Sequence, residues 1–285
     1  MNALEQAWFD ERFQNSSSIG YRITEHLHQS VSRFQTVDIY ATADFGNMLV
    51  LDGCIMLTEA HEFVYHELLV HIPLLSHPQP QTVLVVGGGD GGTVREVLRH
   101  DSIKRVDMVE IDEEVVTVSR QYLPRLSSKL KDLRVRLKFQ DAVEFVKGLE
   151  NAYDVVLVDS TDPIGPGEGL FSRAFYLDVH RALKSGGIVA VQSESPFGLK
   201  GEVGAILRKM RSVFPLARLY WGPIPCYPHG SWSFTYCSKD GQEPQIRRSE
   251  AAAAIEKEAK YYNRDIHQAA FVLPNFMRHL TVRDL

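Results

Sequence analysis

The sequence predicts an α/β fold in which a small N-terminal β domain precedes a doubly wound, mostly parallel sheet. Residues 1–58 read as short strands, because β-branched and apolar runs are broken there by turn residues. From residue 83 onward, continuous apolar runs of strand length alternate with helical patterns, and such runs are typical of strands buried on both faces. We therefore expect an N-terminal β domain at 1–58, a linking helix and boundary at 59–80, and the doubly wound domain at 81–285.

Composition points to a globular protein. The chain has 285 residues, of which 44% are hydrophobic and 24% charged. The formal net charge of −5 argues against nucleic acid and anionic membranes as partners and is compatible with cationic ligands. Cys54, Cys226 and Cys237 are widely separated and form no C-x-x-C pair, so we expect reduced thiols. Without a signal peptide or about 18 consecutive apolar residues, the expected location is the cytoplasm.

The first part of the chain contains a hairpin signal and a helix. Asp52-Gly53 lies between two apolar runs, which predicts a tight β-hairpin. A helix is expected at 59–75, with Tyr65, Leu69 and Ile72 along one stripe, and it ends at the proline-containing segment 77–80.

Two histidines in that helix raise the question of a metal site. His61 and His66 are five residues apart, so they project about 140° apart around the axis, whereas a zinc helix places its histidines four residues apart. We therefore expect no metal ion.

The segment 82–100 reads as strand, glycine turn and helix. Gly87, Gly89 and Gly92 fit the G-x-G-x-x-G frame, which allows a sharp turn and a close approach to a ligand. A glycine-rich segment can also be a simple tight turn, so the motif alone is weak. However, Glu110 follows 18 residues after Gly92 at the end of the strand expected at 106–111, where an acid can bind both hydroxyls of a ribose. Together they predict a Rossmann-like, methyltransferase-type sheet with a nucleotide-like ligand over the turn.

Acidic side chains also end the next two expected strands. Asp141 closes the strand at 135–141, where it could bond an adenine amino group or cap the helix that follows. Asp159 closes the strand at 153–159 and Asp162 follows three residues later, so both are expected at the edge of the sheet where ligands bind. Asp162-Pro163 could also simply start a turn, and the Gly/Pro-rich continuation to Gly169 could form a mobile lid.

The C-terminal part is less regular. Gln192 ends a fifth strand, and Trp232, Phe234 and Tyr236 alternate as in a half-buried strand that returns antiparallel. Residues 251–254 suggest a short exposed helix, and 261–280 carry no assignable pattern. The other elements expected here are helices at 113–122, 142–149, 178–184 and 201–213 and strands at 188–192, 217–220 and 231–237.

The acidic residues near the glycine turn limit which charged ligands can bind there. Asp90 lies inside the glycine turn, where its carboxylate would repel a diphosphate, so a nicotinamide cofactor fits poorly. An S-adenosyl ligand carries a sulfonium and no phosphate. S-adenosylmethionine itself brings a carboxylate to the turn, whereas its decarboxylated form brings only an ammonium that Asp90 could bind. Asp90, Asp159 and Asp162 together favour a cationic donor and a cationic acceptor.

The chain resembles the spermidine synthases, or polyamine aminopropyltransferases, over nearly its whole length. The resemblance implies transfer of the 3-aminopropyl group of decarboxylated S-adenosylmethionine, a co-substrate, to putrescine, which gives spermidine and methylthioadenosine without a bound cofactor. It also implies a homodimer or homotetramer. The motifs that carry it are Leu51-Asp52-Gly53, Glu62-Phe63-Val64-Tyr65-His66-Glu67, Val86-Gly87-Gly88-Gly89-Asp90-Gly91-Gly92, Val109-Glu110-Ile111-Asp112, Asp159-Ser160-Thr161-Asp162-Pro163 with Gly165-Pro166, and Ile224-Pro225-Cys226-Tyr227-Pro228.

The resemblance also implies roles for individual residues. Asp159 would be the base. The donor would be held at the turn glycines Gly87 and Gly89 and at Asp90, with the nucleoside contacted by Gln35, Glu110, Asp141, Ala142 and Pro166. The amines would be bound by Asp90, Asp159 and Asp162 in a channel lined by Tyr65, His66, Gln192 and Tyr227.

Two departures from the family pattern stand out. Asp141-Ala142 replaces the usual Asp-Gly and keeps the acid. The segment 226–230 reads Cys-Tyr-Pro-His-Gly instead of Thr-Tyr-Pro-Ser-Gly, which leaves the contacts of the acceptor's far end open. Agmatine, cadaverine or spermidine therefore remain alternative acceptors. An S-adenosylmethionine-dependent amine N-methyltransferase and a non-catalytic polyamine-binding protein are the competing functions.

Overall fold

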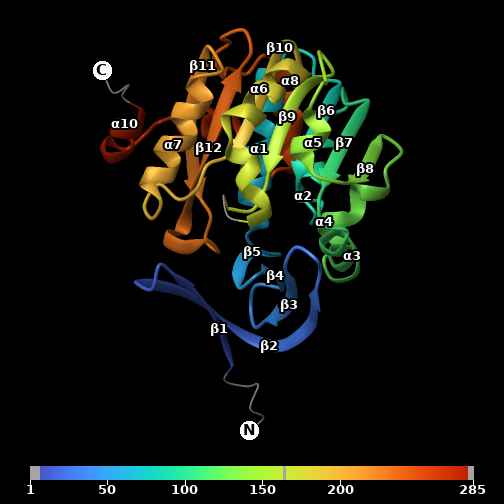
Figure 1. Cartoon of the computed structure of the whole chain (residues 1–285), viewed down its shortest axis with the longest axis vertical. Helices are drawn as coiled ribbons and strands as arrows, with labels where there is room; N and C mark the ends of the chain where they lie inside the picture. Colours follow the sequence, from blue (N-terminus) through green and yellow to red (C-terminus); the bar gives the residue numbers. More distant parts are fainter. Residues whose placement is uncertain (1–6, 163–164, 282–285) are drawn as a thin grey trace.

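The computed structural model describes residues 7–162 and 165–281, which form two sheets (Figure 1). The N-terminal sheet has five antiparallel strands in sequence order, and the Asp52-Gly53 hairpin is confirmed by Leu51 pairing with Cys54. Asp52 and Gly53 both have positive φ angles, 48° and 82°, as a tight hairpin turn requires. The strands are β1 (Trp8–Phe13), β2 (Ser17–Val31), β3 (Thr36–Thr42), β4 (Asn47–Leu51) and β5 (Cys54–Thr58).

The second sheet has seven strands in the order β11-β12-β10-β9-β6-β7-β8. Five neighbouring strands, from β10 to β8, run parallel, and β12 is antiparallel to both of its neighbours, which confirms the doubly wound, mostly parallel fold. The chain winds outward from β6 to β8 and then returns to place β9 on the other side of β6, so the strand order reverses between β6 and β9. The strands are β6 (Thr82–Gly87), β7 (Arg105–Glu110), β8 (Val135–Phe139), β9 (Tyr153–Asp159), β10 (Leu183–Gln192), β11 (Leu216–Pro223) and β12 (Ser231–Ser238).

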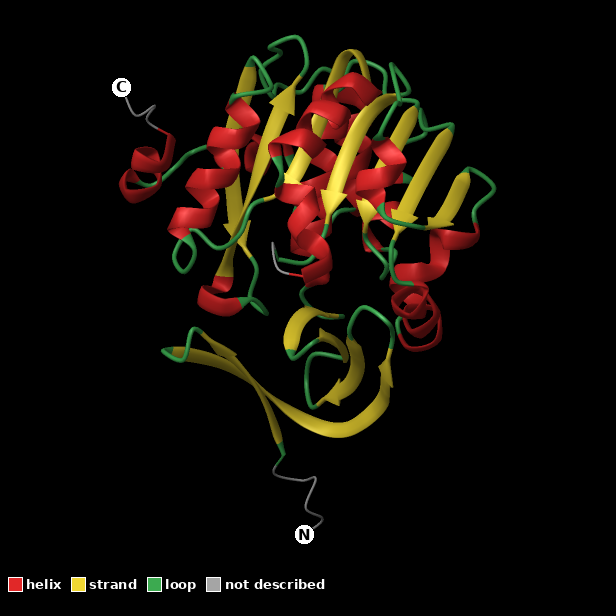
Figure 2. Ribbon diagram, in the orientation of Figure 1, coloured by secondary structure: helices red, strands yellow, loops and turns green. Residues whose placement is uncertain are grey.

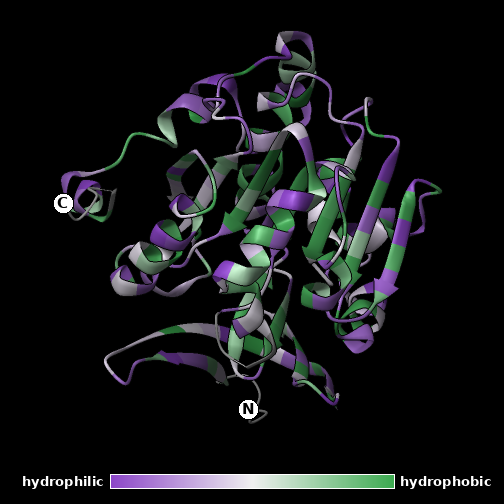
Figure 3. Ribbon diagram, turned by 45° about the horizontal axis from the view of Figure 1, so that its top comes forward, coloured by the Kyte–Doolittle hydropathy of each residue, from purple (hydrophilic) through white to green (hydrophobic). Residues whose placement is uncertain are grey.

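Helices cover both faces of this sheet (Figure 2). Because side chains alternate along a strand, Val83 and Val85 join one hydrophobic cluster and Leu84 and Val86 join the other. The first cluster contains side chains of α1 (Glu62–Ser76), α2 (Gly92–Val97), α8 (Ser249–Glu258) and α9 (Arg264–Ala269). The second contains side chains of α5 (Ala142–Val146), α6 (Arg173–Ala182), α7 (Lys200–Arg211) and α10 (Asn275–Thr281). The strands at the centre of the sheet are largely hydrophobic in Figure 3.

Side chains of α3 (Glu113–Tyr122) and α4 (Pro124–Ser127) pack against the N-terminal sheet in a third cluster. The short 3-10 turns are η2 (Ser128–Lys131), η3 (Gly165–Phe171) and η4 (Pro228–Gly230). Among the described residues, none of the helices combines the length and the apolar content needed to cross a membrane.

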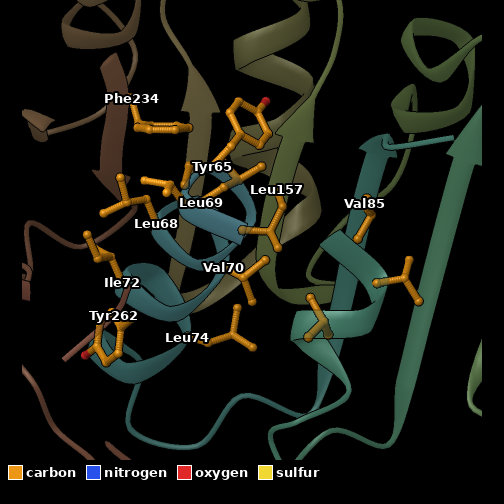
Figure 4. Close-up of a cluster of buried hydrophobic side chains, with 14 of the residues drawn as sticks. Tyr65, Leu68, Leu69, Val70, Ile72, Leu74, Val85, Leu157, Phe234 and Tyr262 are labelled. Carbon is orange, nitrogen blue, oxygen red and sulfur yellow. The ribbon is translucent and has the colours of Figure 1, made fainter. Parts of the chain in front are cut away.

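Tyr65, Leu69 and Ile72 are buried as expected, but burial extends to almost every other residue of helix α1 as well. The helix lies between the sheet, α2 and α8, so every side covers another element. Figure 4 shows its Tyr65, Leu69 and Ile72 among side chains from the sheet and from the C-terminal segment. β12 departs from expectation for the same reason: all eight of its residues are buried, because it lies inside the sheet between β10 and β11.

A buried glutamate of α1 anchors the C-terminal segment. Glu67 is 1% exposed, and its carboxylate accepts hydrogen bonds from the backbone N–H groups of Lys260, Tyr261 and Tyr262 at 2.7–2.9 Å. These bonds hold the loop between α8 and α9 against the far side of the core. The same segment places Tyr262 in the hydrophobic cluster around α1 (Figure 4).

Three other expectations for the C-terminal half are corrected. α6 begins at Arg173, five residues before the expected start, because the Ser172 side chain caps it by accepting a bond from the Phe175 N–H. The alanines of 251–254 lie in α8, where Ala252 is fully buried. The unassigned segment 261–280 contains α9 and most of α10. Cys54, Cys226 and Cys237 are free thiols, as expected.

Candidate active site

The carboxyl ends of the parallel strands face the N-terminal sheet (Figures 1 and 2), and a pocket of about 1070 Å³ opens between the two sheets. It lies where the strand order reverses, which is the usual ligand position in open α/β sheets. Eleven side chains or backbone positions expected at the site line it: Gln35, Tyr65, His66, Gly87, Gly89, Asp90, Glu110, Asp141, Ala142, Asp159 and Tyr227.

The glycine turn fits closely around the end of β9. Gly87 pairs with Asp159 across the sheet, has a φ of 77°, and an added Cβ would lie 2.1 Å from the Asp159 carbonyl oxygen. The Gly88 N–H donates to that same carbonyl at 2.9 Å. A side chain at position 87 would therefore displace β9, and the turn brings Asp90 beside Asp159.

His66, Asp90 and Asp159 form the acidic floor of the pocket, with ligand atoms that all lie within 4.8 Å of one another. The Gly92 N–H donates to Asp90 Oδ1 at 2.7 Å, and the Thr93 hydroxyl donates to Asp159 Oδ2 at 2.6 Å. Burial raises the pKa of Asp159, and the neighbouring Asp90 carboxylate raises it further. Burial also opposes ionisation of Asp90, but the His66 imidazole and the Gly92 N–H outweigh it and lower the pKa of Asp90. The floor thus holds one firmly charged and one more basic carboxylate.

Such a cluster could hold a single cation. Both ring nitrogens of His66 face carboxylates, with Nδ1 2.6 Å from Glu62 Oε2 and Nε2 3.3 Å from Asp90 Oδ1. An imidazole held in this way carries a proton on each ring nitrogen, and the carboxylate oxygens of Asp90 and Asp159 are the acceptors that it leaves for a cation such as an ammonium. His61 instead pairs with Thr58 at 2.9 Å, and the two histidines do not converge.

The other end of the pocket offers acceptors for a sugar and a base. Burial raises the pKa of Glu110 to about 7, although its Oε1 accepts the Asp112 N–H at 3.0 Å. The Gln35 side-chain amide donates a hydrogen bond to Asp112 at 2.9 Å. This bond connects the loop between β2 and β3 of the N-terminal sheet to the segment that follows β7 of the seven-stranded sheet. Asp141 caps α5 by accepting the Val143 N–H at 2.7 Å, which confirms the capping role. Pro166 lies in η3, and its side chain is outside the described part of the structure, as are residues 163–164.

A second pocket of about 440 Å³ adjoins the first, and Tyr65, Tyr227 and Ser160 line both. Asp162 and Gln192 line this second pocket and not the first. Tyr227 is fixed by donating its hydroxyl to the Met56 carbonyl at 2.9 Å, and the Trp232 N–H donates to Gln192 at 2.9 Å. Glu110 and Asp159 thus line the first pocket, and Asp162 lines the adjoining one.

The sequence analysis missed two acids: Glu11, which lines the second pocket, and Glu194, which lies next to Asp162 without lining the pocket. Glu11 lies in β1, and its carboxylate accepts the Ile55 N–H at 2.8 Å while burial raises its pKa to about 7. Glu194 is fully buried two residues after Gln192, with a φ of 70°, and burial and the nearby Asp162 raise its pKa to about 9. An acid just past a strand end was a usable signal for Glu194. Nothing local distinguished Glu11 from an exposed strand residue.

Comparison with known proteins agrees with this geometry. Residues 62–250 match the spermine/spermidine synthase domain and residues 7–59 match the spermidine synthase tetramerisation domain. The chain is 43% identical over 275 residues to a polyamine aminopropyltransferase of Bacillus mycoides, and 42% identical over 277 residues to one of Clostridium perfringens. These alignments cover 96% of this chain and 99% and 98% of the relatives.

Solved structures give the same result. A spermidine synthase in complex with the transition-state analogue AdoDATO is 38% identical with a TM-score of 0.93, and the match covers 96% of this chain and 94% of that one. The spermidine synthase of Thermotoga maritima is 36% identical with a TM-score of 0.90, covering 96% and 93%. The chain therefore belongs to the spermine/spermidine synthase family and is a transferase of the polyamine aminopropyltransferase type.

Proposed function

We propose that the chain moves the 3-aminopropyl group of decarboxylated S-adenosylmethionine to putrescine, which yields spermidine and methylthioadenosine. The observation that carries the proposal is the pair of adjoining pockets, with Asp90 and Asp159 in the first and Asp162 in the second. Three carboxylates in adjoining pockets suit a cationic donor meeting a dicationic acceptor. A related spermidine synthase has been solved with the transition-state analogue AdoDATO, which supports this use of the pocket.

The donor's nucleoside would occupy the end of the pocket near Glu110. Glu110 would accept the two ribose hydroxyls, and Gln35, Asp141, Ala142 and Pro166 would surround the nucleoside. The sulfonium would lie over the turn glycines Gly87 and Gly89, where no diphosphate is needed. Asp90 would bind the aminopropyl ammonium, which leaves the carbon next to sulfur above Asp159.

The acceptor would extend through the second pocket. Tyr65 and Tyr227, whose side chains meet edge to face with ring centroids 6.0 Å apart, would line the aliphatic part of the diamine. Asp162 would take the distal ammonium, helped by Gln192 and Glu11 in the same pocket, while the buried Glu194 contacts Asp162 without lining the pocket. The proximal amine would then lie at Asp159.

The reaction would be an in-line displacement. The neutral proximal amine attacks the carbon next to sulfur, the new C–N bond forms as the C–S bond breaks, and the sulfonium leaves as a neutral thioether. A diamine arrives protonated, because its amines resemble lysine with a pKa of about 10.4. Asp159 would accept the proton that the amine loses, and the raised pKa that burial and Asp90 give it makes it a better base.

The direct test is a matrix of donors and acceptors analysed by mass spectrometry. Decarboxylated S-adenosylmethionine with putrescine should yield a product heavier by one aminopropyl unit, and agmatine, cadaverine and spermidine should react more slowly. A methyl gain from S-adenosylmethionine would instead identify an amine N-methyltransferase. Tight putrescine binding without any product would identify a polyamine-binding protein.

Asp90→Asn should weaken binding of the donor, decarboxylated S-adenosylmethionine, much more than binding of the product, methylthioadenosine. We expect the affinity for decarboxylated S-adenosylmethionine to fall about 10²-fold, because a charge-assisted contact to the ammonium is lost. Methylthioadenosine has no ammonium and should bind within about twofold of the unmodified protein. Calorimetric titration of both ligands measures this difference. An unchanged donor affinity would mean that Asp90 only shapes the turn through its bond to Gly92.

Nucleoside binding should depend on pH through Glu110. Its pKa is raised to about 7, so the carboxylate that accepts the ribose hydroxyls is lost as the pH falls through that value. The affinity for methylthioadenosine should therefore drop about tenfold between pH 8 and pH 6. Glu110→Gln should bind more weakly and show a flat profile. A sloping profile in this variant would assign the titration to another group.

We infer that the N-terminal sheet joins two or four chains, in keeping with its match to a tetramerisation domain. Trp8 on the edge strand β1 is 60% exposed, and Val31 at the end of β2 is 77% exposed, so both are available for such contacts. Trp8→Asp should lower the mass measured by light scattering after gel filtration, with little change in the melting temperature. An unchanged mass would exclude β1 from the interface.

A further inference from the structure

A buried chain of alternating charges lies beneath the donor pocket. Arg95 of α2 donates to both carboxylate oxygens of Glu62, at 3.0 and 2.8 Å. Glu62 in turn bonds His66 Nδ1 at 2.6 Å, one turn along α1, and His66 Nε2 lies 3.3 Å from Asp90 Oδ1. Four side chains thus connect the α1–α2 interface to the floor of the pocket, with the sequence of charges plus, minus, plus, minus.

The imidazole of His66 has no room to turn away. A Cβ at Gly92 would lie 2.3 Å from its Cε1, so only glycine lets the ring rest against the turn. The Tyr65 ring meets it edge-on with centroids 5.4 Å apart, and the histidine side chain is 3% exposed. Burial opposes its charging, but Asp90 and Glu62 outweigh that effect and raise the pKa of His66 well above its usual range. Both ring nitrogens of His66 face carboxylates, and this arrangement favours the imidazolium form.

The charged groups around His66 determine how readily its imidazole is protonated. The negative ones are Glu62 on its own helix, Asp90 on the glycine turn and Asp159 at the end of β9, and the positive one is Arg95 on α2. Glu96 neutralises Arg95 from behind at 2.8 Å. Other titratable groups of the described residues near the floor include Glu110, whose pKa burial raises to about 7, and the hydroxyls and thiol of Tyr65, Tyr227 and Cys226, whose pKa values burial also raises.

We propose that Glu62 and Arg95 are positioning residues that hold His66 charged against Asp90 in the empty enzyme, and that the donor's ammonium displaces the Nε2 proton of His66 when it binds. The inference deepens the proposed function and rests on it, because it requires a donor that carries an ammonium. An ammonium has three N–H donors, and the floor offers three converging atoms, one each from His66, Asp90 and Asp159. His66 Nε2 can accept one of these bonds only after losing its proton.

The exchange is balanced in charge. One cation enters, the Nε2 proton leaves to solvent through the open pocket, and the Nδ1 proton stays in its hydrogen bond to Glu62. Two unit charges about 4 Å apart repel strongly enough, at the dielectric constant usual for partly buried pairs, to change a protonation equilibrium about a thousandfold. Because Glu62 keeps the neutral ring oriented, the same side chain serves as counter-ion in the empty site and as hydrogen-bond acceptor in the occupied one.

The test counts protons. Calorimetric titrations at pH 7.5 in phosphate and in Tris, which differ in ionisation enthalpy, give the number of protons released per ligand bound. Decarboxylated S-adenosylmethionine should release about one proton more than methylthioadenosine, whose binding serves as the matched control for Glu110 and the nucleoside. Equal counts for the two ligands, with both bound and normal turnover, would overturn this inference and leave the proposed function intact. Failure of either ligand to bind would count against the proposed function itself.

Variants identify the source of the proton. Glu62→Gln lowers the charge that holds the proton on His66, so the extra release should fall to near zero while methylthioadenosine affinity stays within about twofold. Asp38→Asn is the control, since Asp38 bonds His26 at 2.7 Å in the N-terminal sheet and should leave the count unchanged. An undiminished release in Glu62→Gln would assign the proton to Asp159 and refute the role of His66. The comparison of the two ligands on the unmodified enzyme stands even if Glu62→Gln does not fold.

Discussion

Asp159→Asn should lower kcat by about 10³-fold while methylthioadenosine still binds. Asparagine has nearly the same shape, can still accept the Thr93 hydroxyl bond, and leaves the Asp159 carbonyl that accepts the Gly88 N–H untouched. What it removes is a proton acceptor whose basicity is raised by burial and by Asp90. The measurement is steady-state turnover with putrescine as acceptor, paired with calorimetric binding of methylthioadenosine.

Thr93→Val tests how much the hydrogen bond from Thr93 to Asp159 contributes to turnover. It removes only the hydroxyl that donates to Asp159 Oδ2 at 2.6 Å, so we expect a loss of turnover about tenfold, much smaller than that of Asp159→Asn. Near-normal turnover in Asp159→Asn would reject Asp159 as the base and favour simple desolvation and orientation of the amine.

Glu67→Ala should be the most destabilising single change outside the pocket. It leaves the backbone N–H groups of Lys260, Tyr261 and Tyr262 without their acceptor and opens a cavity next to α1. The expected loss is about 3 kcal/mol, a large part of the ~5–15 kcal/mol that stabilises a typical domain. Urea denaturation checks it, and the C-terminal segment should become the first site of limited proteolysis.

Glu144→Ala is the matched control. Glu144 is an exposed glutamate of α5 that forms a surface ion pair with Lys147, so its removal should change the free energy of unfolding by less than about 0.5 kcal/mol. A comparable loss in both variants would show that Glu67 contributes no more than a surface charge.

The positions of Asp90, Glu110 and Asp159 could be predicted because each follows a strand or turn that is visible locally in the sequence. Parallel strands bring their carboxyl ends to one edge, so the topology converts local signals into a shared site. Glu11 and the Glu62–Arg95 pair could not be found in this way. Their contacts depend on how β1 and α2 pack against distant elements, and an isolated sequence pattern does not contain that information.

The burial errors have a related cause. Periodicity reports which side of an element is apolar, and it cannot show that a third layer covers the remaining side. α1 carries His66, Glu67 and His71 on sides that look solvent-facing in the sequence, yet all three are buried in ion pairs or hydrogen bonds. The prediction from the apolar stripe therefore underestimated the extent to which α1 is buried.

Part of the wall of the second pocket comes from the N-terminal sheet and not from the sheet that carries Asp90 and Asp159. Glu11, Phe13 and Cys54 line only that pocket and come from the first and last strands of the N-terminal sheet, whereas Asp90 and Asp159 come from the other sheet. Under the proposed function, substitutions at Glu11, Phe13 and Cys54 should change which amines the pocket accepts and leave Asp90 and Asp159 in place. A segment that matches an assembly domain is also the natural place to redesign the acceptor range of the enzyme.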